Sequence, residues 1–148
     1  MTETLTRIRA LPRRLPLDEY EVIELPMTSE DRRRVRRRLT ASDGREFALE
    51  LPTGTVLSVG HALYAEGHTA YVVTAAPEDV LVVTPRSLEE AAFVGHLIGN
   101  LHRDIDIVGG QVIALWNAPL ERRLEKEGLE AERTMRPFKG RPPGEHSH

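Results

Sequence analysis

Apolar and polar residues alternate over short stretches in the first half of the chain, a pattern that predicts strands. Ser42-Asp43-Gly44 separates two of these stretches, and an Asp-Gly pair in that position is a strong hairpin signal. The strand pattern stops near Ala75-Ala76-Pro77, so we predict a small all-β domain over residues 1–75. Its candidate strands are residues 20–25 (closed by Pro26), 32–40, 46–51, 63–65 and 69–74.

The second half begins with a strand and a helix. Residues 80–83 form an unbroken apolar run, as expected of a strand that is buried on both faces. Ser87 and Glu90 have the spacing of a capping box, in which the serine hydroxyl and the glutamate carboxylate bond the first free amides of a helix. The apolar face predicted for this helix consists of Leu88, Ala91, Ala92, Gly95, Ile98 and Leu101.

Turn and cap residues predict the remaining elements. Gly109-Gly110 marks a turn between two strands, and Asn117 can cap a helix that has Pro119 in its first turn and Gly128 just past its end. The strands lie at residues 105–107, 111–115 and 129–136. The order β-α-β-β-α-β is the ferredoxin-like arrangement. We therefore predict an α+β fold class, with the β domain followed by a ferredoxin-like domain over residues 76–137 and a flexible, His-containing tail over residues 138–148.

Composition narrows the possible chemistry. The chain has 148 residues, of which 40% are hydrophobic and 29% charged, and a net charge of −3, so no global positive field attracts nucleic acid. It contains no cysteine, which leaves His, Asp and Glu as candidate metal-binding side chains. The sequence shows neither a secretory h-region nor an apolar run of about 18 residues. We therefore expect a cytoplasmic protein that does not enter the membrane.

The first candidate site is Gly99-Asn100-Leu101-His102, at the end of the first helix. Gly and Asn readily adopt left-handed backbone angles, so we expect them to end the helix and to direct His102 outward. The helix macrodipole alone also favours a histidine at this place, without any metal.

The second candidate is Glu145-His146-Ser147-His148. Two imidazoles one residue apart can chelate nickel, copper or zinc, and a flexible chelator suits the transfer of a metal. The alternative is a tail without function.

The third candidate is the basic run of residues 32–38, with six arginines in seven positions. Glutamates on neighbouring segments predict cross-strand ion pairs on a solvated face. An acidic protein partner is the next interpretation, and a nucleic-acid-binding module is the third.

Motifs of catalysis are missing from the sequence, which has no nucleophile elbow, no phosphate-binding glycine loop and no His-Glu pair at zinc-protease spacing. We therefore predict that the protein is not an enzyme. The remaining enzymatic alternative pairs His102 with Asp104 or Asp106 as acid and base. We assign no role to His61, His68 or His96.

Several segments together resemble the UreE family, the nickel metallochaperones of urease maturation. Residues 87–117 carry the resemblance, with Gly99-Asn100-Leu101-His102 at their centre. Residues 39–45 are similar to the family's N-terminal hairpin, and residues 49–54 to its L-x-L-P-x-G turn. The order of a β domain, a ferredoxin-like domain and a His-bearing tail is also that of the family.

The resemblance implies that His102 is the principal nickel ligand and lies at a homodimer interface, where two copies share one metal. It implies that His146 and His148 complete or load this site, and that zinc or copper can replace nickel in vitro. The N-terminal domain would contact partner proteins and the second domain would form the dimer. The dimer would pass nickel to the accessory GTPase and the urease apoprotein complex.

The sequence departs from the family pattern at several positions. Leu101 stands where the family usually has Arg, and Asp104 where it often has Pro. Trp116 and Asn117 occupy the region in which some members carry a further histidine pair. The tail has two histidines instead of a long His-rich stretch, which argues against nickel storage.

Overall fold

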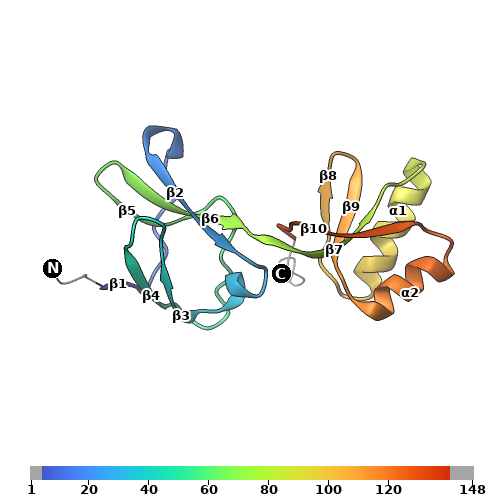
Figure 1. Ribbon diagram of the computed structural model, residues 1–148, viewed down its shortest axis with the longest axis horizontal. Helices are drawn as coiled ribbons and strands as arrows, with labels where there is room; N and C mark the ends of the chain where they lie inside the picture. The colour runs from blue at the N-terminus through green and yellow to red at the C-terminus, as the bar shows by residue number, and fades with distance from the viewer. Residues whose placement is uncertain (1–4, 141–148) are drawn as a thin grey trace. The chain divides into compact units, whose positions relative to one another are not determined.

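The computed structural model describes residues 5–140, and the chain divides into two compact units, Met1–Ala75 and Ala76–His148. The described part of the first unit is built from strands and short 3₁₀ turns, and that of the second from strands and two helices (Figure 1). The predicted α+β class, with a β domain before a βαββαβ region, is confirmed. Neither helix of the described residues is long and apolar enough to cross a bilayer.

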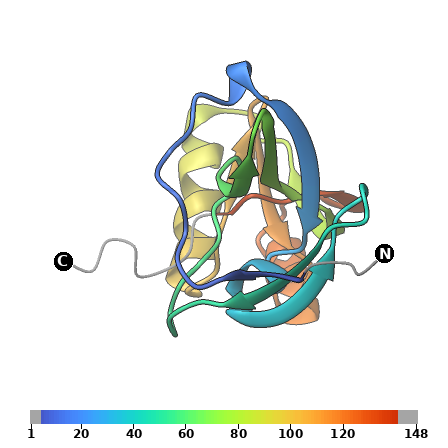
Figure 2. The same ribbon diagram turned by 90° about the vertical axis from the view of Figure 1, so that its left-hand side faces the viewer.

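Two three-stranded sheets form the N-terminal unit. Their strand orders are β1-β4-β3 and β2-β6-β5, so β3 and β2 are edge strands. Figures 1 and 2 show the first sheet on one side of the unit and the second on the other. The elements are β1 (Leu5–Ile8), η1 (Leu17–Glu19), β2 (Glu21–Met27), η2 (Asp31–Arg33), β3 (Arg36–Thr40), β4 (Glu46–Glu50), β5 (Ala62–Glu66) and β6 (Thr69–Ala75).

The hairpin predicted at Ser42-Asp43-Gly44 is present as the antiparallel pair of β3 and β4. In the turn between β3 and β4, the amide of Gly44 donates to the carbonyl of Ala41, and Gly44 has a φ of 93°. Only glycine adopts such an angle without a steric penalty, which explains the Asp-Gly signal.

Two features of the N-terminal unit differ from the prediction. Strand β1, which pairs in parallel with β4, was not predicted, because four residues are too short to show a clear period. Pro26 does not close β2, which continues to Met27. Since β2 is an edge strand, a residue without an amide proton is tolerated there.

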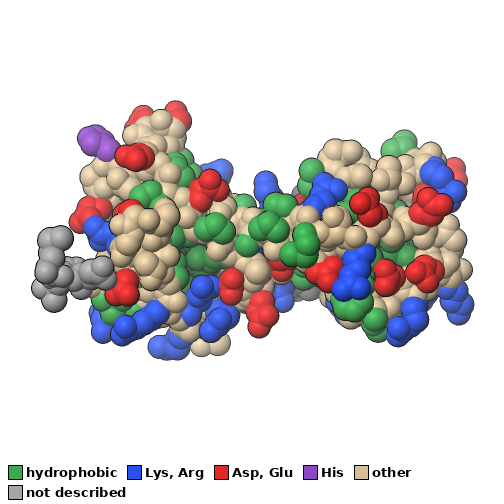
Figure 3. Space-filling view, in the orientation of Figure 1, with side chains coloured by type: hydrophobic (Ala, Val, Ile, Leu, Met, Phe, Trp, Pro, Cys, Tyr) green, Lys and Arg blue, Asp and Glu red, His purple; other side chains and the backbone are tan. Residues whose placement is uncertain are grey.

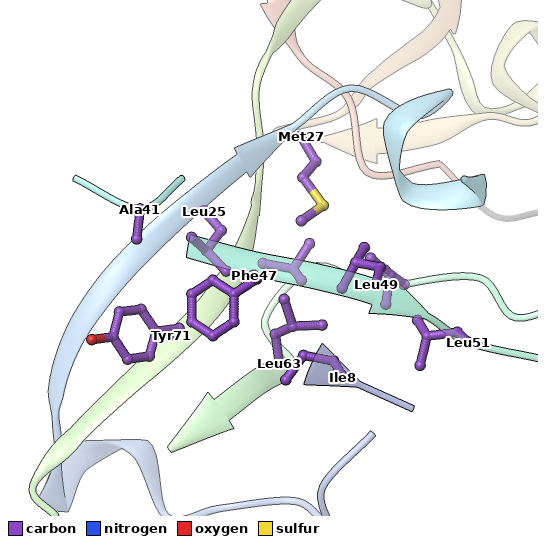
Figure 4. Packing of buried hydrophobic residues seen from close by; sticks show 11 residues of the cluster. Ile8, Leu25, Met27, Ala41, Phe47, Leu49, Leu51, Leu63 and Tyr71 are labelled. Carbon is purple, nitrogen blue, oxygen red and sulfur yellow. The ribbon is translucent and has the colours of Figure 1, made fainter. Parts of the chain in front are cut away.

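The core of the N-terminal unit lies between its two sheets (Figure 4). Phe47 and Leu49 of β4 alternate inward and are 0% and 2% exposed. The ring of Phe47 meets the ring of Tyr71 edge-on, with centroids 5.0 Å apart. Such burial of large apolar side chains is the main source of stability for a sheet pair of this size.

The basic run of residues 32–38 is not one solvated strand. Arg32 lies in η2 and is 3% exposed, and its guanidinium donates to the carbonyl of Met27 at 2.7 Å. Arg34 and Arg37 both lie within ion-pair distance of Asp31, and β3 begins only at Arg36. The prediction was therefore wrong for the first half of the run, because sequence alone did not reveal the buried carbonyl that Arg32 satisfies.

The second unit is a four-stranded antiparallel sheet with the order β10-β7-β9-β8, and both helices pack on one face of it (Figure 1). The central strand β7 is buried over its last four residues, as predicted. On the other face, Phe138 covers Val80, Val82 and Ile113. The elements are β7 (Pro77–Val83), α1 (Leu88–Asn100), β8 (Asp106–Val108), β9 (Gln111–Leu115), α2 (Ala118–Lys126) and β10 (Ala131–Pro137).

The predicted apolar face of α1 was wrong by a partial rotation of the helix. Val94, Leu97 and Ile98 are the buried residues, whereas Leu88 is 90% exposed and Leu101 is 41% exposed. The error arose because alanine and glycine fit either face, so they gave the pattern no direction.

Phe138 was predicted as the first residue of the flexible tail, but it is fully buried in the second unit.

The predicted cap of α1 is half correct. The amide of Glu90 donates to the Ser87 hydroxyl at 3.1 Å, as predicted. However, the Glu90 carboxylate accepts from the amide and guanidinium of Arg86 instead of the Ser87 amide.

Candidate metal centre

His102 lies just beyond the C-terminus of α1 in a left-handed conformation, with a φ of 58°. It is the one non-glycine residue with a positive φ among residues 5–140. Its amide donates to the carbonyl of Gly99 at 2.9 Å, and the amide of Arg103 donates to the carbonyl of Ile98 at 3.3 Å. These two bonds are those of a Schellman motif, in which the position of His102 is usually occupied by glycine.

The prediction that Gly99 or Asn100 takes the left-handed angle is wrong. Both residues belong to α1, and Gly99 is absent from the positive-φ residues. The left-handed geometry costs a residue with a Cβ roughly 1–2 kcal/mol. A residue with a Cβ in this position is strained backbone of the kind that often occurs at functional sites.

The imidazole of His102 is exposed, as a ligand for an incoming ion must be. On α1, Phe93 is 43% exposed, and a Cβ added to Gly95 or Gly99 would meet nothing within 4 Å. Over residues 5–140, no three His, Cys, Asp or Glu side chains are grouped so that they could hold a metal. The described residues of one chain therefore supply His102 without a complete ligand set.

Asp104 and Asp106 are the two carboxylates that the sequence offered as acid or base partners of His102. Asp106 accepts hydrogen bonds from the amides of Ile107 at 3.0 Å and Lys139 at 3.1 Å, so it joins the start of β8 to the segment that follows β10. Asp106 therefore has a structural function. The geometry gives no support for a His102–Asp106 pair.

The position of a possible second histidine pair is occupied by structural residues. Asn117 caps α2, since its side chain accepts from the amide of Leu120 at 3.1 Å. The guanidinium of Arg133 stacks over the ring of Trp116 at 3.8 Å, and Trp116 donates to Glu121. These contacts explain both side chains without a metal.

The other histidines lie in various settings. His61 is half-buried, and its Nε2 lies 3.1 Å from the carbonyl of Pro12, whereas His68 and His96 are exposed. His146 and His148, predicted to assist His102, lie outside the described residues.

Comparison with known proteins identifies the family. The family model described as "UreE urease accessory protein, N-terminal domain" matches residues 1–76. A urease accessory protein UreE from Synechococcus sp. (strain JA-3-3Ab) is 50% identical over 147 residues, which are 99% of this chain and 98% of the relative. The chain belongs to the UreE family.

Other members of the UreE family span a wide range of similarity. The UreE protein of Deinococcus radiodurans is 54% identical over 124 residues, covering 84% of this chain and 80% of the relative. That of Streptococcus vestibularis is 25% identical over 107 residues, covering 72% and 71%. The resemblance found in the hairpin, the L-x-L-P-x-G turn and the Gly-Asn-Leu-His segment is thus confirmed at the level of the family.

Proposed function

We propose that this UreE-family protein is a cytoplasmic nickel carrier of urease maturation, and that it has no catalytic activity. It binds nickel through His102 of two copies of the chain, with His146 and His148 as additional ligands, and delivers the ion to the accessory GTPase and the urease apoprotein. Zinc and copper can occupy the same site in vitro, because imidazole also suits these ions. The observation that carries the proposal is the exposed His102, which takes a left-handed conformation where glycine is usual, in a chain that belongs to the UreE family.

The ligand count supports the involvement of two chains. A single imidazole holds a divalent ion weakly, and the described residues provide no further histidine or carboxylate cluster beside His102. A two-fold axis would place each His102 near its symmetry mate. The small, open surface at Gly95 and Gly99 is compatible with close approach of a second copy.

Transfer of the ion follows from the same arrangement. A site formed by two imidazoles, tail histidines and water can exchange its ligands one at a time, so the ion can be collected and then released to a partner. Only neutral imidazole binds a metal, so nickel binding should weaken as the solution is acidified.

The first unit, residues 1–75, is proposed to contact partner proteins, and residues 76–137 to form the dimer and the metal centre. The tail from residue 138 onward would then contribute its histidines. Its first residue, Phe138, is buried in the core of the second unit.

Complementation of a urease-producing bacterium that lacks its own UreE-family protein tests this function. We expect the wild-type chain to restore urease activity when nickel is limiting, and His102→Ala to fail. His96→Ala is the matched control, because His96 is also exposed and lies on α1, the helix that ends just before His102. Equal urease activity in His102→Ala and wild-type cells would contradict the proposal.

A further inference from the structure

The edge strand β3 presents free backbone groups. Leu51 donates its amide to the carbonyl of Val35, and Ala41 donates to the carbonyl of Arg45, so the odd-numbered residues of this segment bond toward β4. The amides and carbonyls of Arg36, Arg38 and Thr40 consequently point away from β4. Since β3 ends its sheet, no other described strand pairs with these groups.

Two arginine side chains on β3 are exposed and lack a counter-ion. Arg36 and Arg38 form no ion pair within residues 5–140. Glu50 lies opposite Arg36 on β4, but its carboxylate is already bonded by Arg7 and Arg9, which lower its pKa. Figure 3 shows basic side chains gathered around β3 in the N-terminal unit.

A hollow of about 390 Å³ lies beside this edge, between β2 and β3. Leu39 and Arg37 line it from β3, and Leu25 and Met27 line it from β2. The two faces of β3 therefore differ, because Arg36 and Arg38 project to the outer face and Leu39 projects to the inner face beside the hollow. A strand added to β3 would meet the unpaired Arg36 and Arg38 on one face, and on the other Leu39 together with Arg37, which is already paired with Asp31.

Resting on the partner-contacting function proposed for residues 1–75, we propose that β3 is a docking edge for an extended segment of a partner protein in which acidic and apolar residues alternate. The segment adds a strand to the sheet β1-β4-β3 through the backbone groups of Arg36, Arg38 and Thr40. Its acidic side chains lie opposite Arg36 and Arg38 on the outer face. The intervening apolar side chain enters the hollow beside Leu39, where Arg37 is already paired with Asp31 and Glu24 on the β2 wall disfavours a further acid.

Charged edge strands also have a simpler role, which is to prevent pairing with a second copy of the chain. That role accounts for Arg36 and Arg38 but not for the adjoining hollow. It predicts that replacement of the arginines causes self-association and that the wild-type protein binds no peptide.

The test uses fluorescence polarisation of a labelled peptide of alternating glutamate and valine with the full-length protein. We expect saturable binding that weakens with salt and falls about tenfold when Arg36 and Arg38 are both replaced by serine, because two exposed ion pairs are lost. Arg122→Ser with Arg123→Ser is the matched control, since it removes the same charge from α2 and should leave binding unchanged. Thr40→Pro removes one outward amide without changing charge and should also weaken binding, with its fold checked by circular dichroism.

Further probes separate this proposal from general charge attraction. A peptide with the same residues arranged as a glutamate block and a valine block, and one of alternating lysine and valine, should both bind much more weakly. Equal binding of the block peptide, no binding of the alternating peptide, or stronger binding of single-stranded DNA would each overturn the proposal. His102→Ala should bind the alternating peptide normally, so a failure of nickel binding and a failure of this docking edge can be distinguished.

Discussion

At the scale of the residue, the decisive feature is the backbone of His102. The sequence predicted His102 as a metal ligand, because the Gly-Asn-Leu-His segment lies at the end of a helix. It did not predict that His102 itself takes the left-handed angle. Gly99 and Asn100 adopt that angle more readily, but both residues are part of α1, which ends only at Asn100. Intrinsic preference is therefore overridden by where the helix stops.

The strain at His102 leads to a prediction about stability. His102→Gly should stabilise the metal-free second unit by about 1 kcal/mol, because glycine adopts a positive φ without a steric penalty. It should also abolish nickel binding. Urea unfolding followed by the fluorescence of Trp116, the single tryptophan, measures the change in this unit.

His96→Gly is the control for this experiment. His96 lies inside α1, where glycine should destabilise by about 1 kcal/mol. A loss of stability in His102→Gly similar to that in His96→Gly would show that the left-handed position carries no strain.

Arg32 illustrates a second limit of sequence at this scale. Its neighbours suggested a charged surface, yet it is buried and bonds the carbonyl of Met27. Arg32 turns inward because its guanidinium bonds the carbonyl of Met27, which lies outside the arginine run. The pattern of the run itself does not show which arginine makes this contact.

At the scale of the element, turns and caps were predicted well because their signals are local. Gly109-Gly110 forms the turn between β8 and β9, and Asn117 caps α2. The orientation of α1 was not predicted, because Ala91, Ala92 and Gly95 carry little hydrophobic signal. The parallel pairing of β1 with β4 was also missed, since it joins segments that are distant in sequence.

The hairpin turn between β3 and β4 is tied to β6 by a side-chain contact. The hydroxyl of Tyr71 donates to Asp43, and this bond is the largest cause of the lowered pKa of Asp43. The pKa of Tyr71 is raised, chiefly by burial and then by the same bond. The contact therefore stabilises the fold when Asp43 is ionised.

A pH dependence follows from this contact. Because the pKa of Asp43 is lower in the folded state, its contribution is present above the unfolded value of about 3.9 and is lost as the pH falls through the folded value. Tyr71→Phe should make the acid dependence of unfolding less steep, as measured by tyrosine circular dichroism of the N-terminal unit. Tyr20→Phe should retain the wild-type slope, and an unchanged slope in Tyr71→Phe would refute the linkage.

At the scale of the whole molecule, each unit has its own hydrophobic core, and the described part of one chain lacks a complete metal site. The sequence could predict the class of each unit from periodicity and turns. It could not predict a complete ligand set, because a site shared between two copies of the chain, as proposed, leaves no spacing pattern in the sequence.

The tail provides a prediction at this scale. Deletion of residues 145–148 should reduce the amount of nickel bound per dimer or its affinity, because two imidazoles are lost, and should leave the dimer intact. Calorimetric titration measures the first effect and sedimentation velocity the second. Dissociation into monomers on deletion would contradict the proposed function of the tail as an additional ligand.

The most direct test of the central claim is native mass spectrometry of the full-length protein with a slight excess of nickel. The account predicts a dimer with one tightly held nickel ion per two chains, and a dimer without this ion for His102→Ala. A nickel-loaded monomer, or the same tightly held ion in His102→Ala, would contradict it.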